Sequence, residues 1–496
     1  MENRIYGIIT IIAALAIYTY AFKNYRKNKY NYSLYLLILG GLILRIYTSF
    51  DFYLHDWDER FHALVAKNLI DNPFKPMLYS TPLLEYDYKN WAANHVWLHK
   101  QPVPPYTMAL SMFLFGKNIF ALRLPSIILS TITIASTFKI GEILQSKKVG
   151  LLAAFLFSIN GLIIEQTAGR VATDHIDVFF VSLTSFAILF LLKNTKNNSK
   201  KYLVLGSFFT GLAILTKWLP ALIVVPIWIL YSHNKIGVKN IVLNLLLFTV
   251  IVLGLVLPWQ YYILSNFPNE ATWEYAYNKM HIFEALGPHG KPSYYHFDKM
   301  RTIFGELIYL PLIWLLFTSV KGKISDNISK KIISIWILLP YLFFSYATTK
   351  MQGYILICAP AIFIMTSMFY HEIKEHKTKY IKIKNLFLAL LIILPVRYSI
   401  ERIKPFSIRD RHPNWITKIK NIQQNSTNEK LVLFNCKYPI KTMFHTNIIA
   451  YETIPEIDIL NKLNTLDYDV YIDNNKPIMR EWMNLKYVSY IQITGD

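Results

Sequence analysis

Long apolar runs alternate with short polar segments along most of the chain. An apolar run of roughly 15–22 residues can cross a bilayer as a helix, so the pattern predicts about twelve spans. The first run is interpreted as a retained helix, because no small-residue cleavage site precedes Lys23. The predicted spans are 5–22, 32–50, 119–140, 150–167, 178–193, 203–217, 219–232, 240–260, 301–319, 332–346, 354–371 and 384–400. We therefore predict an α-helical polytopic membrane protein.

Basic residues gather between the apolar runs and predict the orientation of the chain. Lysine and arginine favour the cytoplasmic side of a membrane, and one alternation of the spans places every basic cluster there. The clusters lie at 23–29, 147–148, 193–201, 235–239, 321–331 and 371–384. The outer face then receives 51–118, 168–177, 261–300, 347–353 and everything after about residue 400. We predict a multi-pass protein of the plasma or inner membrane, with its site facing the outside or the periplasm.

Some stretches do not fit as spans. Residues 103–116 are short and begin with prolines, which predicts an interfacial or re-entrant helix. The segment 60–69 has the pattern of an amphipathic helix that could lie on the membrane surface.

The C-terminal region has a different character from the rest. Short β-like runs at 431–434, 448–451, 470–472 and 488–493 alternate with helical patterns such as 454–463. We predict a transmembrane domain over 1–400, with its first outer loop at 51–118, and a small extracytoplasmic α/β domain over 401–496.

Composition supports the membrane class. Hydrophobic residues make up 53% of the chain and charged residues only 17%, whereas soluble proteins carry more charge. The net charge of +21 is spread over many short clusters rather than one domain, so we predict no nucleic-acid partner. Cys358 and Cys436 fall in a predicted span and in the C-terminal region, which argues against a disulfide and excludes a cysteine metal site.

An acidic cluster follows the second predicted span directly. Its sequence is His-Asp-Trp-Asp-Glu-Arg, residues 55–60, in a chain with 52 lysines and arginines against 31 acids. A carboxylate in a partly dry site can exchange protons near neutral pH, because desolvation raises its pKa. Further polar residues lie in the other outer segments, at 95–101, 169–177, 281–301 and 348–354. Their side chains could converge on one outward-facing cavity.

Such a cavity suits sugar transfer from a phosphate-linked lipid. The reaction needs a carboxylate to take the proton of the acceptor hydroxyl. It also needs cations that stabilise the lipid phosphate as it leaves.

Simpler interpretations stand beside this one. An acid that flanks a span is most often a solvated loop charge, and lysines near span ends, such as Lys217 and Lys350, often snorkel. His99 with His281 could ligate a cation, but no short His-x-x-x-His or His-x-Glu spacing supports a metal site. We predict no certain cofactor and leave a divalent cation open.

Several short motifs occur in a fixed order. They are Asp58–Ala63, Trp97–Pro102, Phe115–Ser126, Ala172–Phe180, Leu215–Lys217 and Lys350–Pro360. With these motifs, residues 35–365 resemble the GT-C membrane glycosyltransferases of the protein O-mannosyltransferase and lipid A aminoarabinose transferase superfamily. The resemblance implies an inverting transfer from a polyprenyl-phosphate sugar donor to a glycan, lipid or protein acceptor.

The resemblance also implies roles for single residues. Asp58 and Glu59 would be the catalytic residues, with Asp58 as the general base and Glu59 helping to position the site. Lys100 would bind the donor phosphate, Asp174 would shape the sugar or acceptor pocket, and His281 matches a histidine that in some relatives touches a metal or the phosphate. Further substrate-binding residues predicted from the matching blocks are Arg60, Arg123, Lys217 and Lys350.

The chain also departs from the family pattern. Gln101 interrupts a Lys-Pro-Pro segment, and His99 stands where relatives often carry Glu. The donor contacts could therefore differ, and the small outer α/β domain differs enough from relatives to leave the acceptor open.

A transporter or flippase of lipid-linked sugars is the alternative class. Transporters usually place ionisable residues at mid-membrane and often show a repeated half. Here such residues collect at the outer ends of the spans and no repeat is visible, which favours the enzyme.

Overall fold

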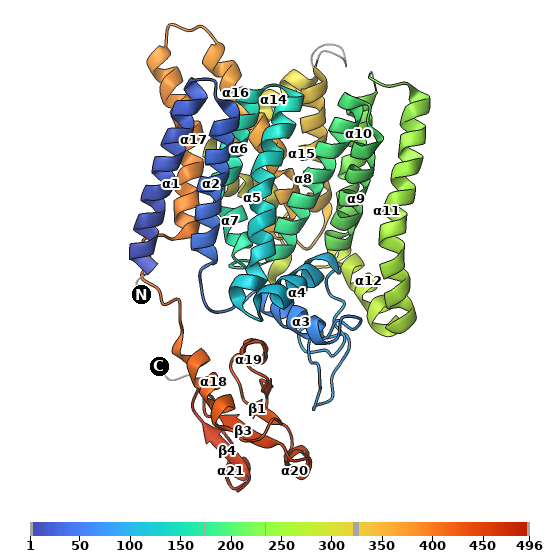
Figure 1. Cartoon of the computed structure of the whole chain (residues 1–496), viewed down its shortest axis with the longest axis vertical. Coiled ribbons are helices and arrows are strands. Elements are labelled where there is room, and N and C mark those ends of the chain that lie inside the picture. Colours follow the sequence, from blue (N-terminus) through green and yellow to red (C-terminus); the bar gives the residue numbers. More distant parts are fainter. Residues whose placement is uncertain (1–2, 173, 234, 321–326, 494–496) are drawn as a thin grey trace.

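The protein is a tall helical bundle with a small α/β domain at one end (Figure 1). The computed structural model describes residues 3–172, 174–233, 235–320 and 327–493. The bundle contains α1 (Asn3–Arg26), α2 (Tyr30–Ser49), α5 (Ile119–Leu144), α6 (Lys147–Ile159), α7 (Gly161–Thr167), α8 (Asp174–Asn197), α9 (Lys200–Lys217), η1 (Leu219–Ile223), α10 (Val224–Ser232), α11 (Val238–Asn266), α14 (Tyr309–Val320), α15 (Ile328–Tyr346), η5 (Gln352–Cys358), α16 (Ala359–Glu375) and α17 (Ile381–Ile403). The loops at the domain end carry α3 (Glu59–Asp71), α4 (Val103–Phe115), α12 (Pro268–Phe283), η2 (Gly287–His289), α13 (Tyr295–Phe304) and η3 (Glu306–Ile308).

The predicted polytopic helical class is confirmed. Among the described residues, eight helices are long and apolar enough to cross a membrane, or nine if α6 and α7, which meet at a bend of 53°, form one span. Shorter apolar helices cover 103–115, 219–232 and 306–320. Each predicted span overlaps helix in the described residues, with 301–319 interrupted at its start, and the total of about twelve stays a prediction.

The predicted span 301–319 is wrong at its start. Helix α13 ends at Phe304, and Gly305 has a φ of +103°, a conformation that L side chains rarely adopt. A Cβ at Gly305 would also stand 3.0 Å from the ring of Pro395 on α17. The chain therefore turns at this glycine, and the apolar helix α14 begins only at Tyr309.

The turns that carry the basic clusters lie together at one end of the bundle, opposite the α/β domain (Figure 1). For five of the six clusters they are the turns between α1 and α2, α5 and α6, α8 and α9, α10 and α11, and α16 and α17. Residues 321–326 of the fifth cluster lie outside the described part of the chain. One alternation of the helices thus fits the spacing of the basic residues.

The two helices of the first outer loop meet different surroundings. The amphipathic segment forms α3 as predicted, but protein covers it: it packs against α4 on one side and the C-terminal domain on another. Helix α4 instead exposes Leu110, Phe113 and Leu114. We infer that α4, and not α3, presents the apolar face to lipid.

The C-terminal domain is a parallel four-stranded sheet with short helices, which confirms the predicted class. The strand order is β2-β1-β3-β4. Its elements are α18 (Asn414–Asn425), β1 (Leu431–Phe434), α19 (Pro439–His445), β2 (Ile449–Ala450), α20 (Ile457–Thr465), β3 (Asp469–Asp473), α21 (Arg480–Met483) and β4 (Val488–Ile491).

The domain docks on the first outer loop. Residues of both, including Leu64 on α3 and Phe444 on α19, share one buried apolar cluster. The Lys67 ammonium donates to the carbonyls of Met443 at 2.7 Å and Thr446 at 2.6 Å, at the C-terminal end of α19. This contact suits a cation, because the last carbonyls of a helix carry partial negative charge.

Candidate functional site

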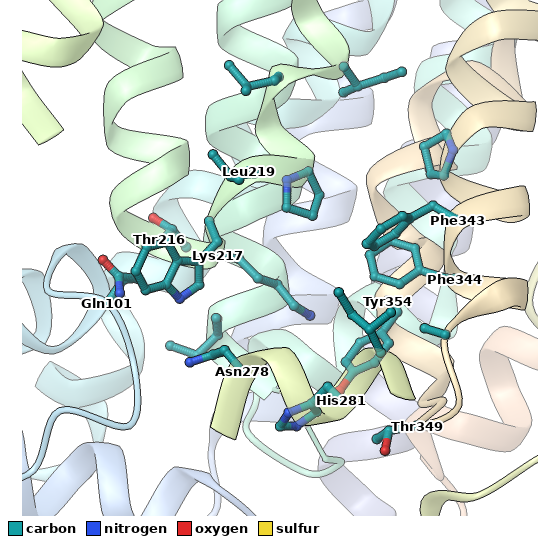
Figure 2. Close-up of a pocket in the computed structure, with 18 of the residues that line it drawn as sticks. Gln101, Thr216, Lys217, Leu219, Asn278, His281, Phe343, Phe344, Thr349 and Tyr354 are labelled. Carbon is teal, nitrogen blue, oxygen red and sulfur yellow. The ribbon is translucent and has the colours of Figure 1, made fainter. Parts of the chain in front are cut away.

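A cavity of about 710 Å³ opens where the bundle meets the outer loops (Figure 2). Its polar end includes His99 and Lys100 from the first outer loop, Lys217 from the end of α9, and His281 from α12. The rest of the lining is mostly apolar, and it includes Leu219, Leu222, Leu339 and Phe343. These four side chains are also exposed. One end can therefore hold a charged group and the other a hydrocarbon chain.

Asp58 lies beside Lys100, behind the polar end of the cavity, and is not itself among the residues that line it. Its carboxylate stands 3.8 Å from the Lys100 ammonium, and both side chains keep roughly a fifth of their surface exposed, 21% and 23%. Asp58 is the N-cap residue of α3, yet its side chain does not cap the helix. It also acts electrostatically on His99 of the first outer segment and on Tyr277 and His289 of the segment 261–300. A carboxylate of partial exposure at this point can accept a proton from a bound molecule.

Lys217 is part of an ion pair on the cavity wall. Its ammonium binds the carboxylate of Asp177 on α8 and lies 4.4 Å from the centre of the Tyr354 ring. Gln166 donates to the same carboxylate at 3.2 Å. Figure 2 shows Lys217, His281 and Tyr354 around the same space. Lys217 is thus held in the cavity rather than reaching out along the membrane.

His281 presents one ring nitrogen away from its helix. Its Nδ1 is 3.0 Å from the carbonyl of Tyr277, one turn earlier, so Nδ1 carries the proton and donates. Burial lowers the pKa of His281, and Lys100 and Lys217 lower it further, against the hydrogen bond to Tyr277. The neutral ring then has Nε2 as an acceptor.

Glu59 and Arg123, also predicted as site residues, pair with each other behind the cavity. Both side chains are fully buried. Burial acts to raise the pKa of Glu59, but Arg123, His55 and His175 together hold that pKa well below its usual range. Arg123 further donates to the backbone carbonyls of Ser49, Asp51 and Tyr53. Neither side chain is among the residues that line the cavity.

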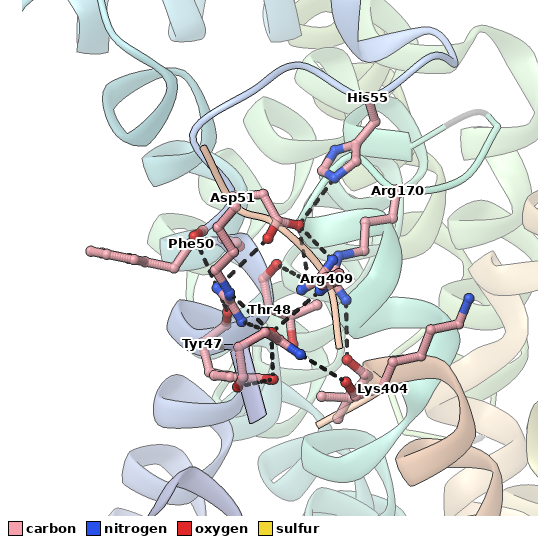
Figure 3. A network of polar contacts seen from close by, with 12 residues as sticks. Tyr47, Thr48, Phe50, Asp51, His55, Arg170, Lys404 and Arg409 are labelled. Atoms are coloured by element: carbon pink, nitrogen blue, oxygen red, sulfur yellow. Dashed lines mark hydrogen bonds and ion pairs between the residues drawn. The ribbon is translucent and has the colours of Figure 1, made fainter. Parts of the chain in front are cut away.

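A second buried network holds the start of the first outer loop (Figure 3). One carboxylate oxygen of Asp51 receives Arg409 at 2.9 Å, Arg170 at 3.1 Å and His55 at 3.2 Å. The other ring nitrogen of His55 lies 2.8 Å from Glu59, which connects the two networks. The segment that ends in Asp58 is therefore fixed to the bundle on one side and to the linker of the C-terminal domain on the other.

The other predicted residues lie around the cavity without lining it. Asp174 is fully buried and pairs with His62 at 3.2 Å. The guanidinium of Arg60 lies over the ring of Phe61. The Lys350 ammonium donates to the backbone carbonyls of Ala347 and Lys291. Substrate contact by these residues stays a prediction.

Asp56 has a structural partner. Its exposed carboxylate binds Lys441 on α19. The acidic cluster thus also contributes to docking the C-terminal domain.

The described residues contain no group of three or more histidine, cysteine or acidic side chains placed to hold a metal ion. His281 and His99 each hydrogen-bond through Nδ1 to a different group, Tyr277 and Glu274. The divalent cation left open by the sequence gains no ligand set from this part of the chain.

Two polar residues of the site were not predicted. Asp177 lies in the second outer loop that the sequence marked, but only its contact with Lys217 shows its place on the cavity wall. Glu274 on α12 hydrogen-bonds to His99. Its position among Trp273, Tyr275 and Tyr277 is a signal of a carboxylate in an apolar setting.

Comparisons with known proteins agree with the predicted resemblance. Residues 99–262 match the family described as dolichyl-phosphate-mannose-protein mannosyltransferase. An undecaprenyl phosphate-alpha-4-amino-4-deoxy-L-arabinose arabinosyl transferase from Pseudomonas fluorescens is 24% identical over 328 residues, which are 62% of this chain and 58% of that protein. One from Pseudomonas paraeruginosa is 24% identical over 335 residues, again 62% and 58%. The chain thus spans less than two thirds of the length of these relatives.

Solved structures share the fold. ArnT from Cupriavidus metallidurans bound to undecaprenyl phosphate superimposes with a TM-score of 0.63 at 14% identity, over 86% of this chain and 90% of that one. The archaeal oligosaccharyltransferase AglB from Archaeoglobus fulgidus, in complex with an inhibitory peptide and a dolichol-phosphate, gives 0.56 at 12% identity, over 85% and 64%. The predicted GT-C-like fold is confirmed.

Proposed function

We propose that the protein is an inverting glycosyltransferase that moves a sugar from a polyprenyl-phosphate donor to a hydroxyl or similar acceptor at the outer face of the plasma or inner membrane. The contact between Asp58 and Lys100 carries the proposal, because it puts a base next to a cation that lines the polar end of a cavity with an apolar extension. The names of the similar proteins support the same donor class, since they specify undecaprenyl phosphate and dolichyl phosphate.

The proposed reaction uses two groups in sequence. The donor phosphate competes with Asp58 for the Lys100 ammonium, and their separation makes room for the sugar. Asp58 then takes the proton of the acceptor hydroxyl, whose oxygen attacks the anomeric carbon from the side opposite the phosphate. The bond between that carbon and the phosphate oxygen breaks, and its electron pair stays on the phosphate, where Lys100 stabilises the added negative charge.

Glu59 and Arg123 support this arrangement from behind. Their buried pair fixes the first turn of α3, and Asp58 stands at the start of that helix. The apolar residues at the other end of the cavity would receive the first isoprene units of the donor. The acceptor, whether glycan, lipid or protein, would approach from the side of the outer loops.

Asp58→Asn tests the proposal. Cells that lack the protein are complemented with wild type or a variant, and their envelope glycans and glycolipids are compared by mass. Loss of the wild-type sugar modification is expected for Asp58→Asn, with unchanged membrane insertion. Asp56→Asn is the matched control, because Asp56 belongs to the same cluster but is exposed and faces Lys441, and it should restore the modification. Full restoration by Asp58→Asn would refute the general-base role.

A further inference from the structure

His99, which lines the cavity, forms a pair with Glu274 that has no role in the reaction described above. The Nδ1 atom of His99 lies 3.2 Å from the Glu274 carboxylate, and both side chains are more than nine-tenths buried. The ring of His99 is stacked on Trp91 at 4.4 Å with an angle of 7°, so its orientation is fixed. His99 lines the cavity directly beside Lys100.

We propose that His99 and Glu274 act as one proton-holding pair, whose Nε2–H donates to the phosphate oxygen that leaves the sugar. This proposal rests on the proposed function, and it adds a positioning and proton-donating role for two side chains. Because Nδ1 faces Glu274, Nε2 lies on the other side of the ring. Among the described residues no hydrogen bond to Nε2 is found, so this atom can meet a ligand.

The charges around the pair set its protonation. Burial lowers the pKa of His99 well below its usual range, and Lys100, His281 and His62 lower it further while Asp58 acts in the opposite direction. Burial raises the pKa of Glu274 to about 7, against Lys100 and His281. Near neutral pH the pair therefore takes up or releases one proton, which it holds jointly.

The protonation state of the pair determines whether Nε2 of His99 is a hydrogen-bond donor or an acceptor toward the cavity. When the pair holds the extra proton, Nδ1 and Glu274 share one proton and Nε2 carries another, so a donor faces the phosphate. When the pair has lost it, the remaining ring proton stays on Nδ1 toward the carboxylate, and Nε2 becomes an acceptor that repels a phosphate oxygen. The same pair thus favours the phosphate below its pKa and opposes it above.

The step balances within the proposed reaction. As the bond to the sugar breaks, its electron pair turns the donor diester into a phosphate monoester, whose second pKa is about 6. Nε2–H passes its proton to that oxygen or shares it, and the proton between Nδ1 and Glu274 moves fully to the ring. Asp58 ends protonated and Glu274 ionised, and exchange with water restores both.

Binding of undecaprenyl phosphate, measured by titration calorimetry on the full-length protein in nanodiscs from pH 6 to 9, tests the pair. Wild type should lose affinity about tenfold for each pH unit above 7, because binding then requires uptake of one proton. Glu274→Gln keeps the size of the side chain but cannot ionise, and should flatten this dependence. His99→Gln should also flatten the pH dependence of binding. The double variant should lose no more affinity for undecaprenyl phosphate than His99→Gln alone, since the two residues act as a unit.

Glu284→Gln is the control, because Glu284 is an exposed glutamate just after the same helix and should keep the wild-type profile. If Glu274→Gln and His99→Gln both keep the wild-type pH dependence, the pair is not the proton holder. In that case a loss of sugar transfer on Asp58→Asn would leave the proposed function standing. A wild-type protein that binds no undecaprenyl phosphate at any of these pH values would overturn both proposals.

Discussion

Arg123 holds Glu59 with two hydrogen bonds, from Nε at 2.6 Å and from Nη2 at 2.9 Å, and the pair is fully buried. The pairing joins two residues that the sequence assigned separately, one to catalysis and one to substrate binding. A bidentate contact of this kind fixes direction as well as distance. We infer that the pair positions the loop that carries Asp58.

Glu59→Gln should therefore lower the stability of the folded protein rather than remove a group that takes part in the reaction. Removing one partner of a buried ion pair costs roughly 3–5 kcal/mol, because the other charge stays buried and unpaired. The apparent melting temperature of the detergent-solubilised protein should fall clearly for Glu59→Gln and hardly for Asp58→Asn. Since its partners depress the pKa of Glu59, its contribution is present above the unfolded pKa of about 4.3 and is lost as the pH falls through the lower folded value. A Glu59→Gln protein with wild-type stability and no activity would instead indicate a direct role in the reaction.

The sequence predicted the helices well and the contacts of the site less well. Apolar length alone locates spans, and alternating short runs located the strands of the C-terminal domain, because burial dictates both patterns. The partner of a charged side chain depends on which loops lie close together in space, and the sequence does not contain the distances between loops. Arg123 and Glu59 are 64 positions apart, and Glu274 reaches His99 across 175. Gly305 shows the same limit on a smaller scale, since its positive φ becomes visible only with the packing of Pro395.

Lys100→Ala should chiefly weaken donor binding. Lys100 lines the cavity and contacts Asp58, so its ammonium lies where it can meet a phosphate beside the proposed base. A charge-assisted hydrogen bond contributes about 1.5–3 kcal/mol, which predicts roughly a tenfold to hundredfold loss of affinity for undecaprenyl phosphate at pH 7. Lys89→Ala is the control, because Lys89 is exposed in the same loop. Equal affinities of wild type and Lys100→Ala would remove the phosphate-binding role.

Lys217 is best tested by a single and a double substitution together with Asp177. A single substitution would change both the stability of the protein and its binding of the donor, and the two effects could not be separated. Lys217→Met leaves the nearly buried Asp177 carboxylate without its ammonium and should lower stability by about 3–5 kcal/mol. Lys217→Met combined with Asp177→Asn removes both charges and should recover most of that loss. The recovered double variant then reports on binding alone. We expect it to bind undecaprenyl phosphate about tenfold more weakly, by roughly 1.4 kcal/mol, since Lys217 lines the cavity. Wild-type affinity in the double variant would show that Lys217 only stabilises the cavity wall and does not bind the phosphate.

Asp51 should control how the C-terminal domain is held. Its carboxylate gathers Arg170 from the bundle and Arg409 from the linker, and it lies 3.7 Å from Arg411. Asp51→Asn removes the negative charge that these arginines share, so repulsion should loosen the linker after α17. Limited trypsin digestion should then cut near residues 404–411 at least several times faster than in wild type.

Asp410→Asn is the matched control for this digestion, because Asp410 is exposed in the same linker and accepts only a local hydrogen bond from His412 among the described residues. Acidification supplies an independent check. Burial acts to raise the pKa of Asp51, but His55, Arg170 and Arg409 outweigh it and hold that pKa far below its usual range. The stabilisation is then complete above the unfolded pKa of about 3.9 and declines only as the pH falls toward the lower folded value. Wild-type linker protection, measured at pH 5 by amide hydrogen exchange, should consequently persist, and equally slow exchange in Asp51→Asn there would show that other contacts hold the domain.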